Sequence, residues 1–366
     1  MRVGGRVEPG FEPVREAFAE VLAEQGGPGA GLAAWSDGAW VVDLWGDGGA
    51  DDAAASGGRP FGPDSLVMPY SVSKPFAAVA LLRLVDRGLV DLDAPMQRYW
   101  PQLRAAVTVR QVLSHQAGLV VLDQPAPTEV FYDWDRLCAL LTAQEPSWAP
   151  GTRHGESALF YGHLVGEVVR RVDGRRPGRF LREEVCGPHG LDFHVGLTPS
   201  QQARAVDLVG LDDRFRQASR VGRPALYAKA IGNPPGAQDP EVVNAPAWRA
   251  AEVPAVNGHG TARAVAGLYV ALLQGALLSP SLLAEASTAQ CAGIDAVFGS
   301  LNAWGLGFGV DDTGFGMGGL GGSLGGASSD GSYAVGFVTA LMGDHGRSAL
   351  LENAVRECLG LDPIAE

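Results

Sequence analysis

The sequence predicts an α+β fold, in which an antiparallel sheet flanked by helices is built from both ends of the chain around an inserted, mostly helical region. Two observations predict it: strand-like segments occur near both ends, and the middle is helical and rich in loops. A sheet with an apolar face must bury that face against helices, which favours packed layers. With 366 residues, 46% of them hydrophobic, the chain can bury a large core in one domain or in two interleaved domains.

The N-terminal part predicts a helix and a hairpin. Apolar residues recur near the helical period across 11–25. Strand-like runs at 31–36 and 39–45 flank Asp37-Gly38, a dipeptide typical of tight hairpin turns. A loop rich in Gly, Ala and Asp, residues 47–62, leads from the hairpin to the next helix.

The rest of the chain predicts helices in the middle and strands near the end. We expect helices at 107–119, 134–142, 161–172, 177–184, 261–274 and 348–358, and strands at 304–310, 315–321 and 333–340. Residues 224–248 are rich in Pro, Gly and Asn, which indicates a long loop that could act as a lid. We therefore expect a sheet domain formed by 1–95 and 255–366, a helical and loop-rich domain formed by 96–254, and an active site at their interface.

The motif Ser71-Val72-Ser73-Lys74 opens the central helix, which continues as an apolar stretch up to Gly88. A helix that is apolar on nearly every face is buried, and Pro75 is tolerated because the first helical N–H groups lack partners in any case. Ser71 therefore lies at the positive end of a buried helix, where backbone N–H groups stabilise an oxyanion. Lys74, three residues on, shares its face and supplies a hydroxyl nucleophile with an amine base.

The use of lysine adds weight to this motif. Of the 28 Lys and Arg residues, only Lys74 and Lys229 are lysines. A guanidinium cannot be deprotonated in a protein, whereas a desolvated ammonium can be, so a lysine at position 74 indicates a role that arginine could not fill. The alternative is an ordinary helix-capping Ser71 beside a surface lysine.

Composition excludes several classes of function. A net charge of −13 argues against nucleic-acid binding, and no basic run indicates a membrane surface. The N-terminus lacks the apolar core of a signal peptide and no stretch could span a bilayer, so we expect a cytoplasmic protein. The four cysteines lack C-x-x-C spacing, which is typical of free thiols, and the seven histidines lack metal-binding spacing. We expect no cofactor and no metal.

The arrangement of motifs resembles the β-lactamase/transpeptidase-like serine hydrolases, nearest the class C β-lactamase branch and its esterase members. The segments that carry the resemblance are Asp43-Leu44-Trp45-Gly46, the Ser71 motif, residues 89–95, residues 107–119, Pro150-Gly151-Thr152, Asn257-Gly258-His259-Gly260 and residues 318–323. The run 107–119, VTVRQVLSHQAGL, matches the family pattern particularly well. The resemblance covers almost the whole chain and implies the β-lactamase/transpeptidase-like fold.

The resemblance also implies roles for individual residues. Ser71 would be the acylated nucleophile and Lys74 its proton partner, and the N–H groups of Ser71 and Leu320 would form the oxyanion hole. In relatives a tyrosine that follows the Pro-Gly-Thr segment completes the proton relay, but here Glu156 stands at that position. Tyr161 comes five residues later and is expected to turn away on the next helix.

The replacement of the relay tyrosine leaves two interpretations open. A carboxylate can serve as a general base, and a neighbouring ammonium would orient it. Because Glu156 favours the charged form of Lys74, the plausible division is Glu156 as the base and Lys74 as electrostatic support. The other interpretation is an ion pair in a site that has lost its activity.

A second departure concerns substrate binding. Relatives carry Lys or His where this chain has Met317, and that charge helps to bind a substrate carboxylate. We expect Met317, Gly318 and Gly319 of the glycine-rich strand to contact the substrate, together with Trp248 and His259. A core position for Trp248 and a structural role for His259 are the alternatives.

Two further motifs have no matching context. Gly321-Gly322-Ser323-Leu324-Gly325 fits the nucleophile elbow, which needs a helix after the serine, whereas a turn and a strand follow. The match of 314–319 to G-x-G-x-x-G has no following helix and predicts no dinucleotide site.

The sequence therefore predicts a serine acyl-transfer enzyme that acts on a small molecule through an acyl-enzyme at Ser71: an esterase, an amide hydrolase or a transacylase. A relay that disfavours water as acceptor would instead favour acyl transfer or cyclisation in a biosynthetic pathway. The alternative is a catalytically silent binding protein on the same fold. The substrate's identity and the formation of a homo-oligomer stay open.

Overall fold

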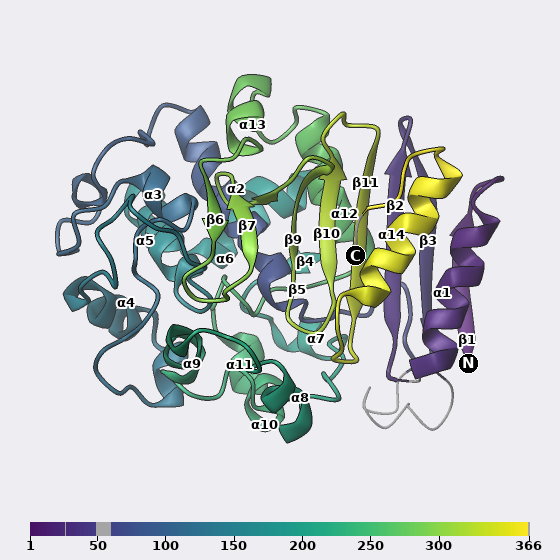
Figure 1. Cartoon of the computed structure of the whole chain (residues 1–366), viewed down its shortest axis with the longest axis horizontal. Helices are drawn as coiled ribbons and strands as arrows, with labels where there is room; N and C mark the ends of the chain where they lie inside the picture. Colours follow the sequence, from purple (N-terminus) through teal and green to yellow (C-terminus); the bar gives the residue numbers. More distant parts are fainter. Residues whose placement is uncertain (26, 49–59, 365–366) are drawn as a thin grey trace.

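The computed structural model describes residues 1–25, 27–48 and 60–364, which form an α+β fold around one large antiparallel sheet (Figure 1). The order of its nine described strands is β1-β3-β2-β11-β10-β9-β8-β7-β6. These strands are β1 Arg2–Val7, β2 Ala30–Ser36, β3 Ala39–Asp47, β6 Cys291–Ile294, β7 Leu301–Trp304, β8 Gly309–Val310, β9 Gly314–Gly318, β10 Leu324–Ser328 and β11 Tyr333–Thr339. A separate pair joins β4 Phe193–His194 of the inserted region to β5 His259–Gly260, which follows that region. The predicted fold class is confirmed.

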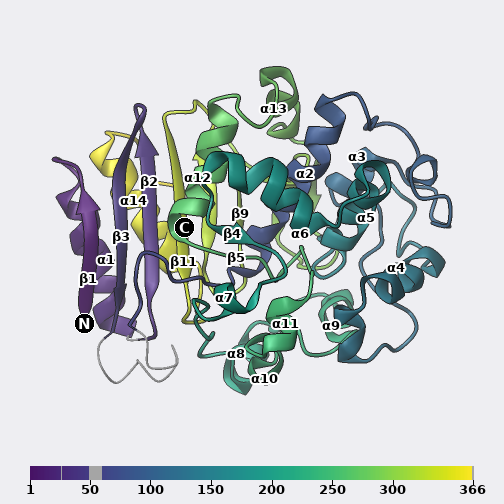
Figure 2. The same cartoon turned by 180° about the vertical axis from the view of Figure 1, so that it is seen from behind.

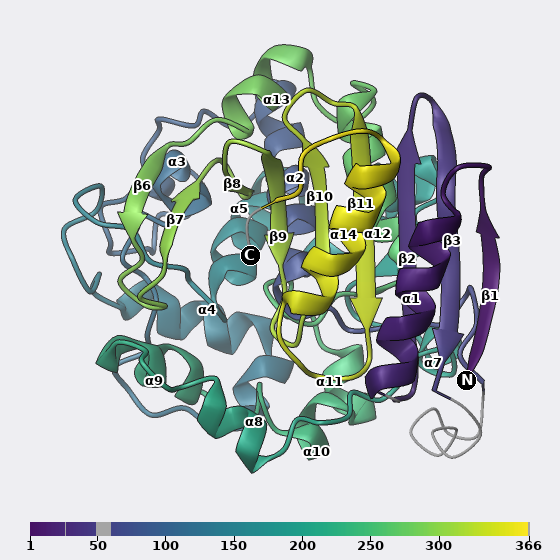
Figure 3. The same ribbon diagram turned by 45° about the vertical axis from the view of Figure 1, so that its right-hand side comes forward.

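Helices from both ends of the chain cover the sheet. On one face, α1 (Glu12–Gln25) and α14 (Gly346–Cys358) lie side by side (Figure 3), and their apolar residues pack with those of β2, β3 and β11. On the other face lies α12 (Ala262–Leu273), which is seen from behind in Figure 2. Burial of both faces explains why all seven residues of β11 are buried.

The remaining α-helices of the described residues include the long helix α2. They are α2 Lys74–Asp86, α3 Val109–Leu113, α4 Trp134–Ala143, α5 Tyr161–Asp173, α6 Pro177–Phe180, α7 Pro199–Gln202, α8 Asp213–Ala218, α9 Ala225–Gly232, α10 Pro240–Val243, α11 Pro246–Ala250 and α13 Pro280–Ala286. As its apolar sequence predicts, α2 is buried along most of its length, and it contacts α5 and β9. No described helix is both long and apolar enough to cross a bilayer.

Several sequence-based predictions of secondary structure were wrong. The strand predicted at 304–310 is a turn that joins β7, which ends at Trp304, to β8. The segment 224–248 is not a continuous loop, because α9, α10 and α11 lie within it. Prolines that suggested a loop are the first residues of short helices, where a missing N–H costs nothing, as at Pro240 and Pro246. The glycine-rich segment that forms β10 was interpreted as a turn. Most of the loop predicted at 47–62 lies outside the described residues.

A buried histidine in α5 makes a prediction about stability possible. His163 has no exposed surface, and its ring stacks on Trp134 with the centroids 4.4 Å apart. Within the described part of the chain, neither ring nitrogen has a hydrogen-bond partner. Burial lowers the pKa of His163 from 6.5 to about 3, against a smaller opposite effect of the Glu167 carboxylate. The ring is therefore neutral in the folded protein at neutral pH.

His163→Phe should make the protein less sensitive to acid. Between the unfolded pKa of 6.5 and the folded pKa of about 3, only the unfolded chain binds a proton at His163, so the free energy of unfolding falls as the pH falls. Urea unfolding at about pH 8 and pH 5 should show that the free energy of unfolding falls less in the variant than in the wild type. The reason is that unfolding of the variant takes up roughly one proton fewer. At the higher pH the imidazole is neutral in both states, so that comparison isolates packing. An equal pH dependence in both proteins would contradict the prediction.

Candidate active site

Ser71 lies in a tight turn directly before α2. Residues Tyr70–Ser73 form a 3-10 turn and the α-helix begins at Lys74, so the helix starts later than the sequence predicts. Tyr70 has a positive φ of 47°, which is uncommon for a residue with a side chain. Its hydroxyl donates to the carbonyl of Ala237 at 3.1 Å, and this contact ties the turn to the inserted region.

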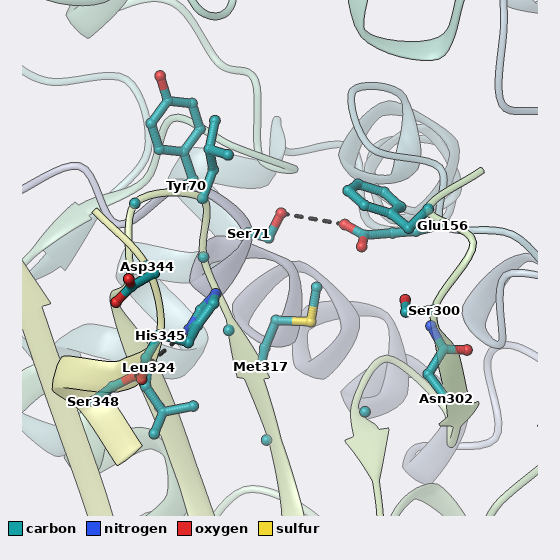
Figure 4. Close-up of a pocket in the computed structure, with 18 of the residues that line it drawn as sticks. Tyr70, Ser71, Glu156, Ser300, Asn302, Met317, Leu324, Asp344, His345 and Ser348 are labelled. Carbon is teal, nitrogen blue, oxygen red and sulfur yellow. Dashed lines mark hydrogen bonds between the residues drawn. The ribbon is translucent and has the colours of Figure 1, made fainter. Parts of the chain in front are cut away.

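The side chains of Ser71, Lys74 and Glu156 meet in one hydrogen-bonded group. Lys74 Nζ lies 2.7 Å from Ser71 Oγ and 2.9 Å from Glu156 Oε1. Ser71 Oγ donates to the same carboxylate oxygen at 3.2 Å, and Figure 4 shows the two side chains facing each other. Lys74 Nζ also donates to the carbonyl of Ala255 at 3.2 Å. An ammonium has three N–H donors, and three acceptors surround this one.

Burial determines the electrostatics of this group. Lys74 has no exposed surface and Glu156 is 8% exposed. Burial lowers the pKa of Lys74 below its usual 10.5, while the charge of Glu156 and its hydrogen bond to the amine act in the opposite direction. A buried charge that loses its partner is strongly destabilising, so each member of the pair depends on the other.

A second carboxylate, Asp295, holds the segment that carries Glu156. The backbone N–H of Glu156 donates to Asp295 Oδ2 at 2.9 Å, and Asp295 is fully buried. The other oxygen, Oδ1, accepts from the backbone N–H groups of Val297 and Phe298 at 2.8 and 2.7 Å. The loop between β6 and β7 is therefore tied to Glu156. No pattern near Asp295 in the sequence indicates a partner so distant along the chain.

The backbone of the glycine-rich strand approaches Ser71 closely. A Cβ at Gly319 would lie 2.0 Å from the carbonyl oxygen of Pro69, so only glycine fits there. Gly319 N–H donates to the carbonyl of Ser323 at 2.8 Å. Among the described residues, neither the N–H of Ser71 nor that of Leu320 has a hydrogen-bond acceptor. Both residues line the same cavity, which leaves two donors free for a ligand.

Tyr161 lies away from this group, as expected. Its hydroxyl donates to the carbonyl of Leu113 at 3.2 Å, and its ring packs against His115 with the centroids 4.6 Å apart. His115 is buried and its Nδ1 accepts from the N–H of Ser157 at 3.2 Å. Burial lowers the pKa of His115 well below 6.5, with a smaller effect from the Lys74 charge. The imidazole is a neutral structural group.

A cavity of about 1470 Å³ opens beside Ser71 and Glu156. Met317, Gly318 and Gly319 line it, in agreement with their expected place near a substrate. Sequence reasoning missed several other lining residues, which come from α8, α9 and the segment between them, from β7 and from the start of α14: Arg214, Phe215, Arg223, Tyr227, Asn302, His345 and Ser348. The local sequence around each of these residues does not indicate that they line one cavity.

Two residues expected to contact a substrate do not line the cavity. Trp248 has no exposed surface, and its indole N–H points to Met68 Sδ at 3.2 Å. His259 is 1% exposed and its Nδ1 bonds to the carbonyl of Asn257 at 2.8 Å. Instead the backbone of this segment meets the turn that carries Ser71, since Gly258 N–H donates to Ser73 Oγ at 3.0 Å. Both predictions are corrected: the two side chains belong to the core.

Ser323 is likewise structural. It is 2% exposed, and its Oγ accepts from the N–H of Thr339 at 3.2 Å. The segment after it forms β10 rather than a helix, so it lacks the context of a nucleophile elbow.

Comparison with known proteins places these features in a family. The family model Beta-lactamase matches residues 14–357. The esterase/beta-lactamase LipL of Mycobacterium tuberculosis is 34% identical over 286 residues, which is 75% of this chain and 65% of LipL. Esterase EstB of Burkholderia gladioli is 31% identical over 155 residues, which is 37% of this chain and 39% of EstB. The chain thus aligns with less than two thirds of each of these relatives.

Solved structures match over nearly the whole chain. A crystal structure of a family VIII carboxylesterase is 34% identical with a TM-score of 0.87, covering 98% of this chain and 100% of that one. A penicillin-binding protein homolog from Caulobacter crescentus is 32% identical with a TM-score of 0.85, again covering 98% and 100%.

Proposed function

Because the chain belongs to the β-lactamase family, we propose that it is a serine hydrolase that cleaves a carboxylic ester or amide through an acyl-enzyme on Ser71. The observation that carries the proposal is the buried group of Ser71, Lys74 and Glu156, in which the serine hydroxyl donates to a carboxylate. The names of the relatives, an esterase/beta-lactamase and a family VIII carboxylesterase, favour an ester as the substrate.

In the proposed acylation step, Glu156 is the general base. Ser71 Oγ attacks the substrate carbonyl carbon while its proton passes to Glu156 Oε1. In the resting arrangement this oxygen already accepts the hydrogen bond of the serine hydroxyl. The carbonyl electrons move to the oxygen, which the N–H groups of Ser71 and Leu320 stabilise. When the tetrahedral intermediate collapses, Glu156 returns the proton to the leaving oxygen or nitrogen.

Lys74 acts in this mechanism as a fixed cation. Its three acceptors, Ser71 Oγ, Glu156 Oε1 and the Ala255 carbonyl, match the three protons of an ammonium. A charged Lys74 cannot accept the serine proton, but it orients the hydroxyl and stabilises the Glu156 carboxylate. Deacylation follows by the same route, with water or another small nucleophile giving its proton to Glu156. A nucleophile other than water yields transacylation or cyclisation.

The first prediction of this proposal is that Ser71 is the only residue acylated by an activated ester or a fluorophosphonate. Intact mass should increase by one adduct, and peptide mapping should place it on Ser71. Ser71→Ala should abolish the adduct, whereas Ser323→Ala should retain it, because the Ser323 hydroxyl is buried. An adduct on Ser323, or none with any activated acyl donor, would refute the proposed nucleophile.

A second prediction tests the base. Glu156→Gln keeps the shape of the side chain and removes its charge, so it should lower the rate of Ser71 acylation by roughly 10²–10⁴-fold, the usual worth of general acid–base catalysis. The KM should change little. If the protein is a silent binding protein with a structural ion pair, the same substitution lowers the melting temperature, because a buried ammonium loses its partner, and there is no acylation to lose. Unchanged acylation would show that another group is the base.

A third prediction concerns Met317, which is 6% exposed and lines the cavity. The wild-type protein should hydrolyse penicillins poorly, because no cation stands at this position for the substrate carboxylate. Met317→Lys should raise kcat/KM for anionic substrates relative to neutral esters by about one to two orders of magnitude, the worth of one charge-assisted hydrogen bond. Met317→Leu is the control of similar volume and should leave kcat/KM unchanged for both anionic substrates and neutral esters. Efficient penicillin turnover by the wild type, or equal effects on both substrate classes, would contradict it.

A further inference from the structure

The cavity at Ser71 continues past β9 to the other side of this strand. In Figure 4, Ser71, Glu156 and Met317 lie on one side of the β9 ribbon. Leu324 and His345 lie on the other side, and all five residues line the same cavity. The open space is therefore larger than the surroundings of the reacting groups, and the part beyond β9 has no role in the mechanism above.

This outer part follows one face of α14. The lining residues from this helix and its N-cap are His345, Ser348, Ala349 and Glu352. Their spacing is that of residues on a single helix face. Since an α-helix rises 1.5 Å per residue, the outer part runs along α14 for about 10 Å. We call it the α14 groove.

The floor of the α14 groove has almost no side chains. Gly316 of β9 lies opposite Gly309 of β8 on one side and Gly326 of β10 on the other, and all three line the cavity. A Cβ on Gly309 would have no neighbour closer than 3.4 Å, so the space above it is open. The bare backbone leaves room for an extended chain to lie between α14 and the β8–β9 turn.

The charged side chains that line the α14 groove are acidic, while Arg356, which does not line it, lies behind Glu352. Glu352, Asp311 and Asp312 line this part of the cavity. Among the residues that the structure describes, two arginines line the cavity. They are Arg214 of α8 and Arg223 of the segment before α9. A chain that ends in a carboxylate would be repelled along the groove, whereas an uncharged chain would not.

We propose that the α14 groove binds an elongated, uncharged chain attached to the ester bond that Ser71 cleaves. This inference rests on the proposed function and names its substrate class: esters with a long neutral acyl or alkyl group. Continuity of the cavity from Ser71 to Glu352 identifies the occupant as the distal part of the substrate itself.

Ala349 provides the test, because its side chain lines the groove, while the neighbouring Leu350 is 47% exposed and does not line it. The wild type, Ala349→Phe and the control Leu350→Phe are assayed on p-nitrophenyl acetate and decanoate, and on methyl and decyl butyrate. The first pair varies the acyl chain and the second the alkyl chain. We expect Ala349→Phe to lower kcat/KM for the long member of one pair by roughly 10-fold or more, as an obstructed apolar pocket does, with little change for the short member. Leu350→Phe should behave as the wild type.

The charge of the chain end is tested with the p-nitrophenyl monoester of decanedioic acid, which carries a terminal carboxylate. Its kcat/KM in the wild type should lie well below that of the decanoate ester. An equal loss for short and long esters in Ala349→Phe, or no loss in either pair, would overturn the groove as a binding site while leaving the proposed function intact. Failure of every ester, together with no acylation of Ser71, would overturn the proposed function instead.

Discussion

The buried amino group of Lys74 is the constraint on which the rest of the site depends. A polar group without exposed surface is tolerated only when its N–H groups have acceptors. Those acceptors come from three separate parts of the chain: Ser71 in the turn before α2, Glu156 before α5, and the carbonyl of Ala255 before β5. One side chain therefore fixes how these three segments meet.

This constraint gives a physical reason for Asp295. Glu156 can balance Lys74 only if its own segment is held in place, and the backbone N–H of Glu156 is bonded to a fully buried carboxylate. Asp295 in turn fixes the loop between β6 and β7, at the far edge of the sheet. The position of the carboxylate is thus set by sheet and helices together, which favours a defined geometry over a mobile surface contact.

Local patterns predicted much of the fold and the central pair, and distant contacts limited the rest. The Ser71 motif and the apolar helix after it are adjacent in sequence, so helical spacing was enough to bring Lys74 to the serine. The fold class followed from strand-like segments near both ends. By contrast, the hydrogen bond from Glu156 to Asp295 and the burial of Trp248 and His259 depend on packing between segments that are far apart in the sequence. A short stretch of sequence does not contain this information. The short helices within 224–248 were missed because proline begins a helix as readily as it ends one.

The glycines of β9 and the loop after it serve two geometric needs at once. Gly319 must lack a side chain so that the strand end can pass against Pro69, and this approach brings Leu320 to the cavity that holds Ser71. Further along the strand, Gly316 faces glycines on both neighbouring strands, which keeps the floor beside α14 bare. A side chain at Gly319 would disturb the turn that carries Ser71, and side chains at Gly316 and its neighbours would fill the outer part of the cavity. The absence of side chains at these glycines thus connects the cavity beside Ser71, where a bond would be broken, to the α14 groove, where the rest of a long substrate would lie.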